Sequence, residues 1–255
     1  MSGSRAALSV VLITLDCAET LAHCLDSVTW ADEFVIADSG STDGTVELAA
    51  ARGARVVHQE WLGFGKQKQF AVEQATHEWV LCLDTDERVT SELRASIEQA
   101  LTSPTQHAYE FARCNRFLGR YLRHGEGYPD WCLRLFQKSH ARWSEDVVHE
   151  KVITLGTVGR LGGDLLHESA ESLDSYLAKQ NRYTTLAAEE LIQQGGGVSR
   201  LQMLLSPVFR FVKFYVFRRG FLDGLPGLVH IGIGCFNSFC KYAKMIEIQR
   251  RQESS

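Results

Sequence analysis

One apolar stretch near the N-terminus decides the fold class: Leu8-Ser9-Val10-Val11-Leu12-Ile13-Thr14. The stretch is continuous and rich in β-branched residues, which is typical of a strand buried on both faces of a sheet. The next apolar residues, Leu21, Cys24, Leu25 and Val28, recur at the spacing of one helix face. A buried strand followed by an amphipathic helix is the first half of a βαβ unit.

The same alternation continues along the chain. Strands and helices are predicted in turn at residues 34–37, 46–51, 54–57, 70–76, 79–83 and 93–101. Repeated β and α units indicate a parallel sheet with right-handed crossovers. Residues 108–117 and 131–136 are predicted strands in a mixed part of the sheet. We therefore expect an α/β, Rossmann-like fold with a mostly parallel sheet.

The overall composition restricts the class of protein. The chain has 255 residues and a net charge of −4, without the basic excess of a nucleic-acid-binding protein. Its seven cysteines form no CxxC pair, so we expect buried free thiols in a reducing cytosol and no zinc site. The N-terminal segment resembles a first strand rather than a signal peptide, and no run of ~18 apolar residues is present. We expect a cytoplasmic protein.

The sequence changes character after about Gly163. A long helical pattern covers residues 173–193, and the last sixty or so residues are aromatic and basic. We expect a catalytic domain at residues 1–165 and a helical extension at residues 166–255.

Within the extension, one predicted helix is amphipathic and basic. Val208, Phe211, Val212 and Tyr215 lie at i, i+3, i+4 and i+7, with arginines and lysines nearby. Such a helix can lie on an anionic membrane surface. The alternative is that it packs on the catalytic domain or on another subunit.

Acidic residues follow the buried strands. Asp38 ends the second strand, and Asp84 and Asp86 follow the strand at residues 79–83. Ligands of open α/β sheets bind outside the carboxyl ends of the strands, where these acids would meet. Carboxylates that close repel unless a cation lies among them, and Mg²⁺ or Mn²⁺ prefers such oxygen ligands. The alternative is that Asp84 and Asp86 only cap the next helix.

Asp16 follows the first strand, and Glu19 stands three residues later. This spacing is that of an acidic N-cap with a capping box. We therefore expect Asp16 to cap the first helix.

Several segments together resemble glycosyltransferase family 2: SVVLIT at residues 9–14, ADSGSTDGT at 37–45 and LDTD at 83–86. Three more are similar to lipopolysaccharide core β-1,4-glucosyltransferases: EWLGFGKQK at 60–68, VHE at 148–150 and RGFLDG at 219–224. The resemblance covers nearly the whole chain. It implies a GT-A fold, a nucleotide-sugar donor and an inverting reaction.

The resemblance also implies roles for individual residues. Thr14 and Asp16 would line the pocket for the nucleotide base and ribose, and Asp38 would accept a hydrogen bond from the base. Lys66 would approach the base or the phosphates.

Two more residues have implied roles at the phosphates. Asp84 would contact the ribose or a metal-bound water, and Asp86 would ligate the metal, Mg²⁺ or Mn²⁺. Arg134 interrupts an apolar run and therefore needs a partner. A diphosphate and a buried ion pair are both open as that partner.

An inverting transfer needs a base that takes the proton of the attacking hydroxyl. The segment at residues 143–150 resembles the one in which relatives carry the catalytic acid. Asp146 is the predicted base and Glu145 the second candidate, the alternative being that these acids are a solvated loop face. His149 is a candidate for positioning the acceptor, or a structural residue.

The chain departs from the family pattern after the first strand, where relatives commonly have Asn-Glu and this sequence has Asp16-Cys17. A thiol cannot replace a carboxylate contact. This keeps open a non-catalytic, transferase-like protein that binds or assembles at the membrane surface, or a transferase with another donor.

Three other enzyme classes do not fit. No glycine fingerprint of a dehydrogenase follows the first strand, and no GxxxxGK[ST] of a P-loop enzyme is present. An aspartyl phosphatase would need a threonine where Arg88 stands. The expected activity is transfer of a hexose, glucose from UDP-glucose, to an inner-core heptose of lipopolysaccharide. The expected place is the inner face of the cytoplasmic membrane, where the acceptor is lipid-linked.

Overall fold

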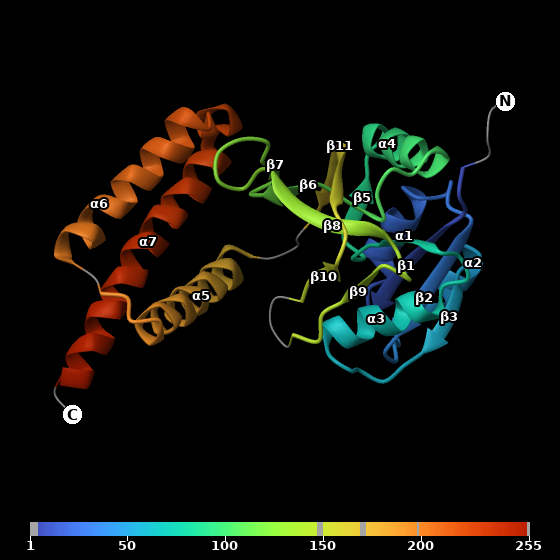
Figure 1. Cartoon of the computed structure of the whole chain (residues 1–255), viewed down its shortest axis with the longest axis horizontal. Helices are drawn as coiled ribbons and strands as arrows, with labels where there is room; N and C mark the ends of the chain where they lie inside the picture. The colour runs from blue at the N-terminus through green and yellow to red at the C-terminus, as the bar shows by residue number, and fades with distance from the viewer. Residues whose placement is uncertain (1–4, 147–149, 169–171, 198, 254–255) are drawn as a thin grey trace. The chain divides into compact units, whose positions relative to one another are not determined.

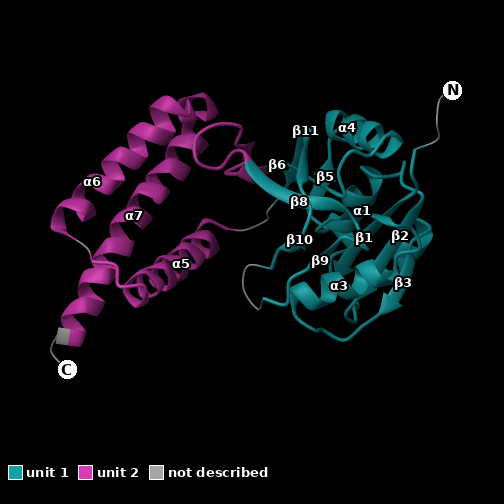
Figure 2. Cartoon of the chain, in the orientation of Figure 1, with its two compact units in different colours: residues 1–113, 130–168 teal, residues 114–129, 169–255 magenta. Residues whose placement is uncertain are grey.

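The structure is a computed structural model that describes residues 5–146, 150–168, 172–197 and 199–253. The chain divides into two compact units (Figure 2). The first contains residues 1–113 and 130–168, and the second contains residues 114–129 and 169–255. The second unit thus includes a segment from the middle of the expected catalytic domain, in addition to the C-terminal helices.

The first unit is built on a mixed sheet. Its strand order is β3 (Arg55–His58), β2 (Glu33–Asp38), β1 (Leu8–Thr14), β4 (Trp79–Cys82), β8 (Asp130–Gln137), β6 (Ala108–Phe117), β11 (Val158–His167) and β5 (Glu87–Val89). The first four are mutually parallel, and β8 runs antiparallel to both β4 and β6. A two-stranded sheet pairs β9 (Ala141–Trp143) with β10 (Val152–Thr154).

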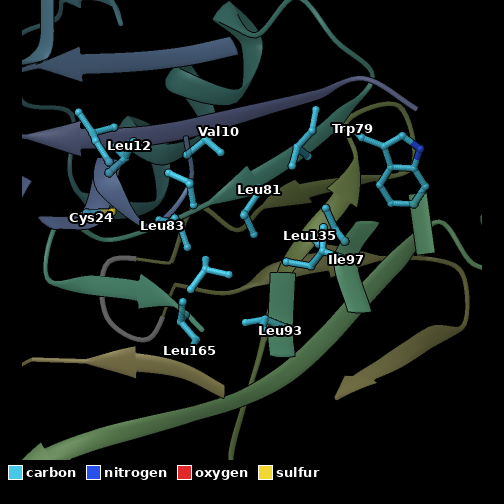
Figure 3. Close-up of a cluster of buried hydrophobic side chains, with 14 of the residues drawn as sticks. Val10, Leu12, Cys24, Trp79, Leu81, Leu83, Leu93, Ile97, Leu135 and Leu165 are labelled. Carbon is cyan, nitrogen blue, oxygen red and sulfur yellow. The ribbon is translucent and has the colours of Figure 1, made fainter. Parts of the chain in front are cut away.

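Four helices accompany this sheet (Figure 1): α1 (Ala18–Asp26), α2 (Thr45–Ala51), α3 (Phe64–Gln74) and α4 (Ser91–Thr102). Buried side chains form two clusters because successive residues of a strand point to opposite faces. Val10 and Leu12 belong to the cluster drawn in Figure 3, and Val11 belongs to the other. The apolar run of β1 is thus buried on both faces, as its sequence predicts.

The register of β1 places the acidic strand ends together. Thr14 is opposite Asp38 of β2, and Val11 is opposite Cys82 of β4. Because the three strands are parallel neighbours, the residues that follow them emerge at one edge of the sheet. Asp16, Asp38 and Asp84 therefore all leave the sheet at the same end.

The predicted cap of α1 is wrong. The N-cap residue is Cys17, which makes no side-chain cap bond, and Asp16 has a positive φ of 46°. The carboxylate of Asp16 accepts a hydrogen bond from the Thr42 backbone N–H instead (2.7 Å). Asp43 takes over the capping role and accepts from the Ala18 N–H at 3.0 Å. The helix start and the loop after β2 therefore hold each other in place.

The described part of the second unit contains helices, the end of β6 and β7 (Arg120–Tyr121), and the loops that join them. Its helices are α5 (Leu173–Gln193), α6 (Arg200–Phe211), a π-helical segment (Val212–Phe217), a 3₁₀ turn (Gly220–Asp223) and α7 (Gly224–Glu253). Figure 1 shows α6 beside α7, and the Ser206 and Ser238 hydroxyls join them at 2.5 Å. Lys244 of α7 reaches the Asn181 carbonyl of α5 at 2.7 Å. None of the helices described has a stretch both long and apolar enough to span a bilayer.

Candidate active site

The carboxylate of Asp38 is buried at the end of β2 and holds the turn that follows. It accepts hydrogen bonds from Thr14 Oγ1 (2.7 Å), from the Gly40 and Ser41 backbone N–H groups (2.9 Å each) and from the Ser41 hydroxyl. Burial by itself would raise the pKa of Asp38, but these hydrogen bonds outweigh it and hold the pKa below its usual range. Four donors fill the lone-pair sites of one carboxylate. A nucleotide base that donated to Asp38 would therefore have to displace one of them.

Asp84 follows β4 and is held between two cations. Its Oδ1 lies 2.9 Å from Lys68 Nζ, and its Oδ2 lies 3.1 Å from the Arg134 guanidinium. Burial alone would raise the pKa of Asp84, but Lys68 and Arg134 outweigh it and hold the pKa well below its usual range. Asp84 thereby connects the end of β4 to α3 and β8.

Glu87 lies fully buried beneath Asp84 and shares its cations. It accepts a hydrogen bond from the Asp84 backbone N–H (2.9 Å), and the nearest guanidinium groups are those of Arg113 (3.5 Å) and Arg134 (3.8 Å). Burial and the neighbouring Asp84 carboxylate raise the pKa of Glu87, against the opposing effect of Arg134. Two adjacent acids thus explain why an arginine interrupts the apolar sequence of β8.

The indole of Trp143 covers both cations. Its ring centroid lies 4.7 Å from Lys68 Nζ and 5.1 Å from the Arg134 guanidinium carbon. Lys68 also lies 3.4 Å from a Glu150 oxygen. Of the two partners left open for Arg134, the structure shows the ion pair.

Replacing Arg134 by methionine is expected to destabilise the fold by about 3 kcal/mol, because breaking a buried ion pair leaves charges uncompensated. The measurement is the free energy of unfolding in urea. Arg160→Met is the matched control, since Arg160 is largely exposed and pairs with Glu110. An exposed pair contributes less than about 1 kcal/mol. Equal losses in the two variants would contradict the role given to Arg134.

Asp86 approaches a histidine from a distant strand. Its Oδ2 lies 3.1 Å from Nε2 of His167, the last residue of β11, and its carbonyl accepts the Glu168 N–H at 2.9 Å. Both side chains are partly exposed. A carboxylate oxygen and an imidazole nitrogen suit a divalent metal such as Mn²⁺.

The protein groups near Asp86 form only part of a metal-binding shell. Among the described residues, no three His, Cys, Asp or Glu side chains gather closely enough to enclose an ion. A Mg²⁺ or Mn²⁺ bound with a nucleotide takes its other ligands from phosphates and water. The donor set at Asp86 and His167 fits a metal of this kind.

The second candidate for the base, Glu145, lines a cavity next to Trp143. A cavity of about 260 Å³ is lined by residues that include Lys66, Trp143 and Glu145. Lys66 Nζ lies 3.8 Å from Glu145, and both side chains are largely exposed. Asp146 is exposed beside them, while His149 lies outside the described residues.

Three residues of this site were not predicted from the sequence. Lys68, not Lys66, is the lysine that reaches Asp84, and Glu87 is the acid buried beneath it. The helical period of α3 separates Lys66 and Lys68 by two positions and so points them to different sides. Nothing in the sequence around His167 indicates that it meets Asp86, because β11 lies far along the chain from Asp86.

The first unit has a half-parallel, half-antiparallel sheet with a carboxylate pair after its central parallel strand, which is the α/β arrangement expected of a GT-A glycosyltransferase. The family model described as glycosyl transferase family 2 matches residues 9–145, and the chain belongs to this family. The predicted α/β fold and the resemblance stated from the sequence are both confirmed.

Known relatives cover nearly the whole chain. The lipopolysaccharide core biosynthesis glycosyltransferase LpsC of Rhizobium meliloti is 30% identical over 94% of this chain and 92% of its own. An uncharacterized glycosyltransferase of Rickettsia prowazekii is 30% identical over 97% of this chain and 89% of its own. Glucosyl-3-phosphoglycerate synthase of Mycobacterium tuberculosis, solved with Mn²⁺, UDP and glucosyl-3-phosphoglycerate, has a TM-score of 0.48 and 17% identity over 76% of this chain and 82% of that one.

Proposed function

We propose that the protein is an inverting glycosyltransferase that moves glucose from UDP-glucose to an inner-core heptose of lipopolysaccharide. The observation that carries the proposal is the meeting of Asp86 and His167 beside Asp84, at the carboxyl end of the parallel strands. This is where α/β sheets bind nucleotides. The lipopolysaccharide acceptor is supported by the relative LpsC, whose name assigns it to core biosynthesis.

Each residue has a part in binding the donor. Thr14, Asp16 and Asp38 would line the base and ribose pocket, with Asp38 already ionised and rigid. Lys66 would approach the base or the phosphates from its exposed position on α3.

The diphosphate would lie between Asp84, Asp86 and Arg134. Asp86 and His167 would hold a divalent cation, which when bound neutralises charge on the departing diphosphate. Asp84 and Arg134, locked by their ion pair, would keep the loop after β4 in the geometry that presents Asp86.

The transfer itself is a single in-line displacement. The acceptor hydroxyl oxygen forms a bond to the anomeric carbon while the bond from that carbon to the diphosphate oxygen breaks. Asp146 takes the hydroxyl proton, and UDP leaves with the bonding electron pair. Glu145 is the second candidate for the base.

Thermal stability in the presence of nucleotides tests the donor class. UDP and UDP-glucose with Mn²⁺ or Mg²⁺ are expected to raise Tm, whereas ADP and GDP are not, because only a ligand bound to the folded state stabilises it. Transfer of labelled glucose to a heptose acceptor tests the reaction. A UDP shift without transfer to any acceptor would favour the alternative, a donor-binding assembly protein. A preference for another nucleotide would overturn the donor.

A further inference from the structure

Charge is divided unequally between the two units. The second unit has 14 lysines and arginines against eight aspartates and glutamates, whereas the whole chain has 27 against 31. The second unit is therefore net positive by six and the first net negative by ten. Such asymmetry favours an anionic partner for the helical unit.

Apolar side chains are exposed along one face of α6 and the π-helical segment. The two phenylalanines on it, Phe209 and Phe217, are 70% and 77% exposed. The other exposed members are spaced three or four residues apart and so share a helix face. They are Leu201, Leu205, Val208, Val212 and Val216.

The side of α6 next to this face contacts the rest of the unit. Ser206 contacts Ser238 of α7, and the Arg210 guanidinium donates to Glu126 at 3.0 Å through Nε. The exposed face is therefore the one that no helix of the described part of this unit covers.

The exposed face shares two of its residues with the apolar stripe expected from the sequence. Phe211 and Tyr215 stack on each other with centroids 4.9 Å apart and are only partly exposed. Val208 and Val212 of the expected stripe are exposed, and Phe209 and Phe217, which were not part of it, are more exposed still.

A groove runs along the exposed face. This groove of about 570 Å³ is lined by Leu201, Leu205 and Phe209, by Arg210, which is paired with Glu126, and by Lys213 of the π-helical segment. Exposed cations stand at both ends of this apolar stretch, Arg200 at the start of α6 and Lys213 just after its end, and an anionic bilayer offers both acyl chains and phosphates to such a surface. This is the arrangement of helices that lie in a membrane interface.

We propose that α6 and the π-helical segment form a docking surface for an anionic lipid bilayer. Phe209 and Phe217 insert among the acyl chains, and Arg200 and Lys213 lie at the lipid phosphates. This surface would hold the protein at the inner face of the cytoplasmic membrane, where a lipid-linked acceptor is expected. The choice of that leaflet rests on the proposed function. Lipid binding itself requires neither donor nor acceptor.

Vesicle co-sedimentation of the full chain without nucleotide tests the docking surface. The vesicles contain phosphatidylcholine alone or phosphatidylcholine with phosphatidylglycerol, and stronger binding is expected for the second. Phe209→Ser with Phe217→Ser is expected to weaken binding at least about tenfold, because both rings are removed from the apolar interface. Arg200→Glu with Lys213→Glu is expected to weaken binding to the anionic vesicles by a similar factor.

Matched controls lie on the first unit. Leu155→Ser and Lys151→Glu change an exposed apolar and an exposed basic residue there, and binding is expected to stay as in the wild type. Unchanged Tm in all variants excludes misfolding as the cause. Equal binding to both vesicle types, or equal loss in the controls, would overturn the proposal.

Two further measurements separate the alternatives. A wild-type dimer in sedimentation velocity that the Phe209→Ser, Phe217→Ser variant abolishes would assign this face to a second copy and overturn the lipid proposal. Transfer to a water-soluble heptose acceptor is expected to be unaffected in both surface variants. A surface variant that loses vesicle binding and keeps transfer therefore tests the docking surface alone. If the wild type binds vesicles but transfers no sugar to the heptose acceptor, the proposed function fails and the docking surface stands.

Discussion

Replacing Asp86 by alanine is expected to lower kcat/KM for sugar transfer by about a thousandfold. The physical reason is that Asp86 would supply the carboxylate that fixes the cation against the leaving diphosphate, and a metal at such a site contributes several kcal/mol to the transition state. A factor of ten in rate corresponds to about 1.4 kcal/mol. The fold is expected to persist, because the backbone carbonyl of Asp86, which accepts the Glu168 N–H, is retained in alanine.

The measurement is steady-state transfer together with the Mn²⁺ dependence of the UDP-induced change in Tm. The variant is expected to lose the metal-dependent part of the stabilisation by UDP and to keep the rest. Asp26→Ala is the control, since Asp26 is an exposed acid paired with Arg52. Wild-type activity in Asp86→Ala, or a UDP shift with unchanged metal dependence, would remove Asp86 from the metal site.

Asp146→Asn is expected to lower kcat by about a hundredfold to ten-thousandfold, the range for loss of a general base. Asparagine keeps the size of the side chain but cannot take the proton of the attacking hydroxyl. Donor binding is expected to be unchanged, because Asp146 acts on the acceptor side. The measurement is kcat for transfer alongside the dissociation constant of UDP-glucose.

Glu145→Gln is the matched control for Asp146→Asn. Glu145 is largely exposed and approaches Lys66 at 3.8 Å, so its loss is expected to cost transfer no more than a few-fold. A large loss of kcat in Glu145→Gln with a small one in Asp146→Asn would exchange the two roles. Equal losses of kcat and donor affinity in Asp146→Asn would show that Asp146 is a binding residue.

The predicted strands of the parallel half agree with the structure because their sequences carry the whole signal. A strand buried on both faces is apolar at nearly every position, so the runs that became β1, β2 and β4 are visible without any knowledge of their neighbours. The strand-end acids were visible for the same reason, since the carboxyl ends of parallel strands meet at one edge.

Predictions that depended on partners distant in sequence were less successful. Asp16 has the local spacing of a cap, yet Asp43 from the loop after β2 is in place to cap α1. The amphipathic period of α6 correctly indicates a helix but not which of its faces meets α7. Periodicity reports that a face is apolar, whereas packing decides what covers it.

The sequence by itself determined the α/β class and the family. It also determined where along the chain the apolar runs of the parallel strands lie and which acids follow them. Only the tertiary structure decided that Lys68 and Arg134 neutralise Asp84, that Glu87 lies buried beneath it and that His167 faces Asp86. The physical reason is that burial follows from local composition along a strand or helix. The pairing of charges depends instead on which distant elements the sheet brings within a few ångströms of each other.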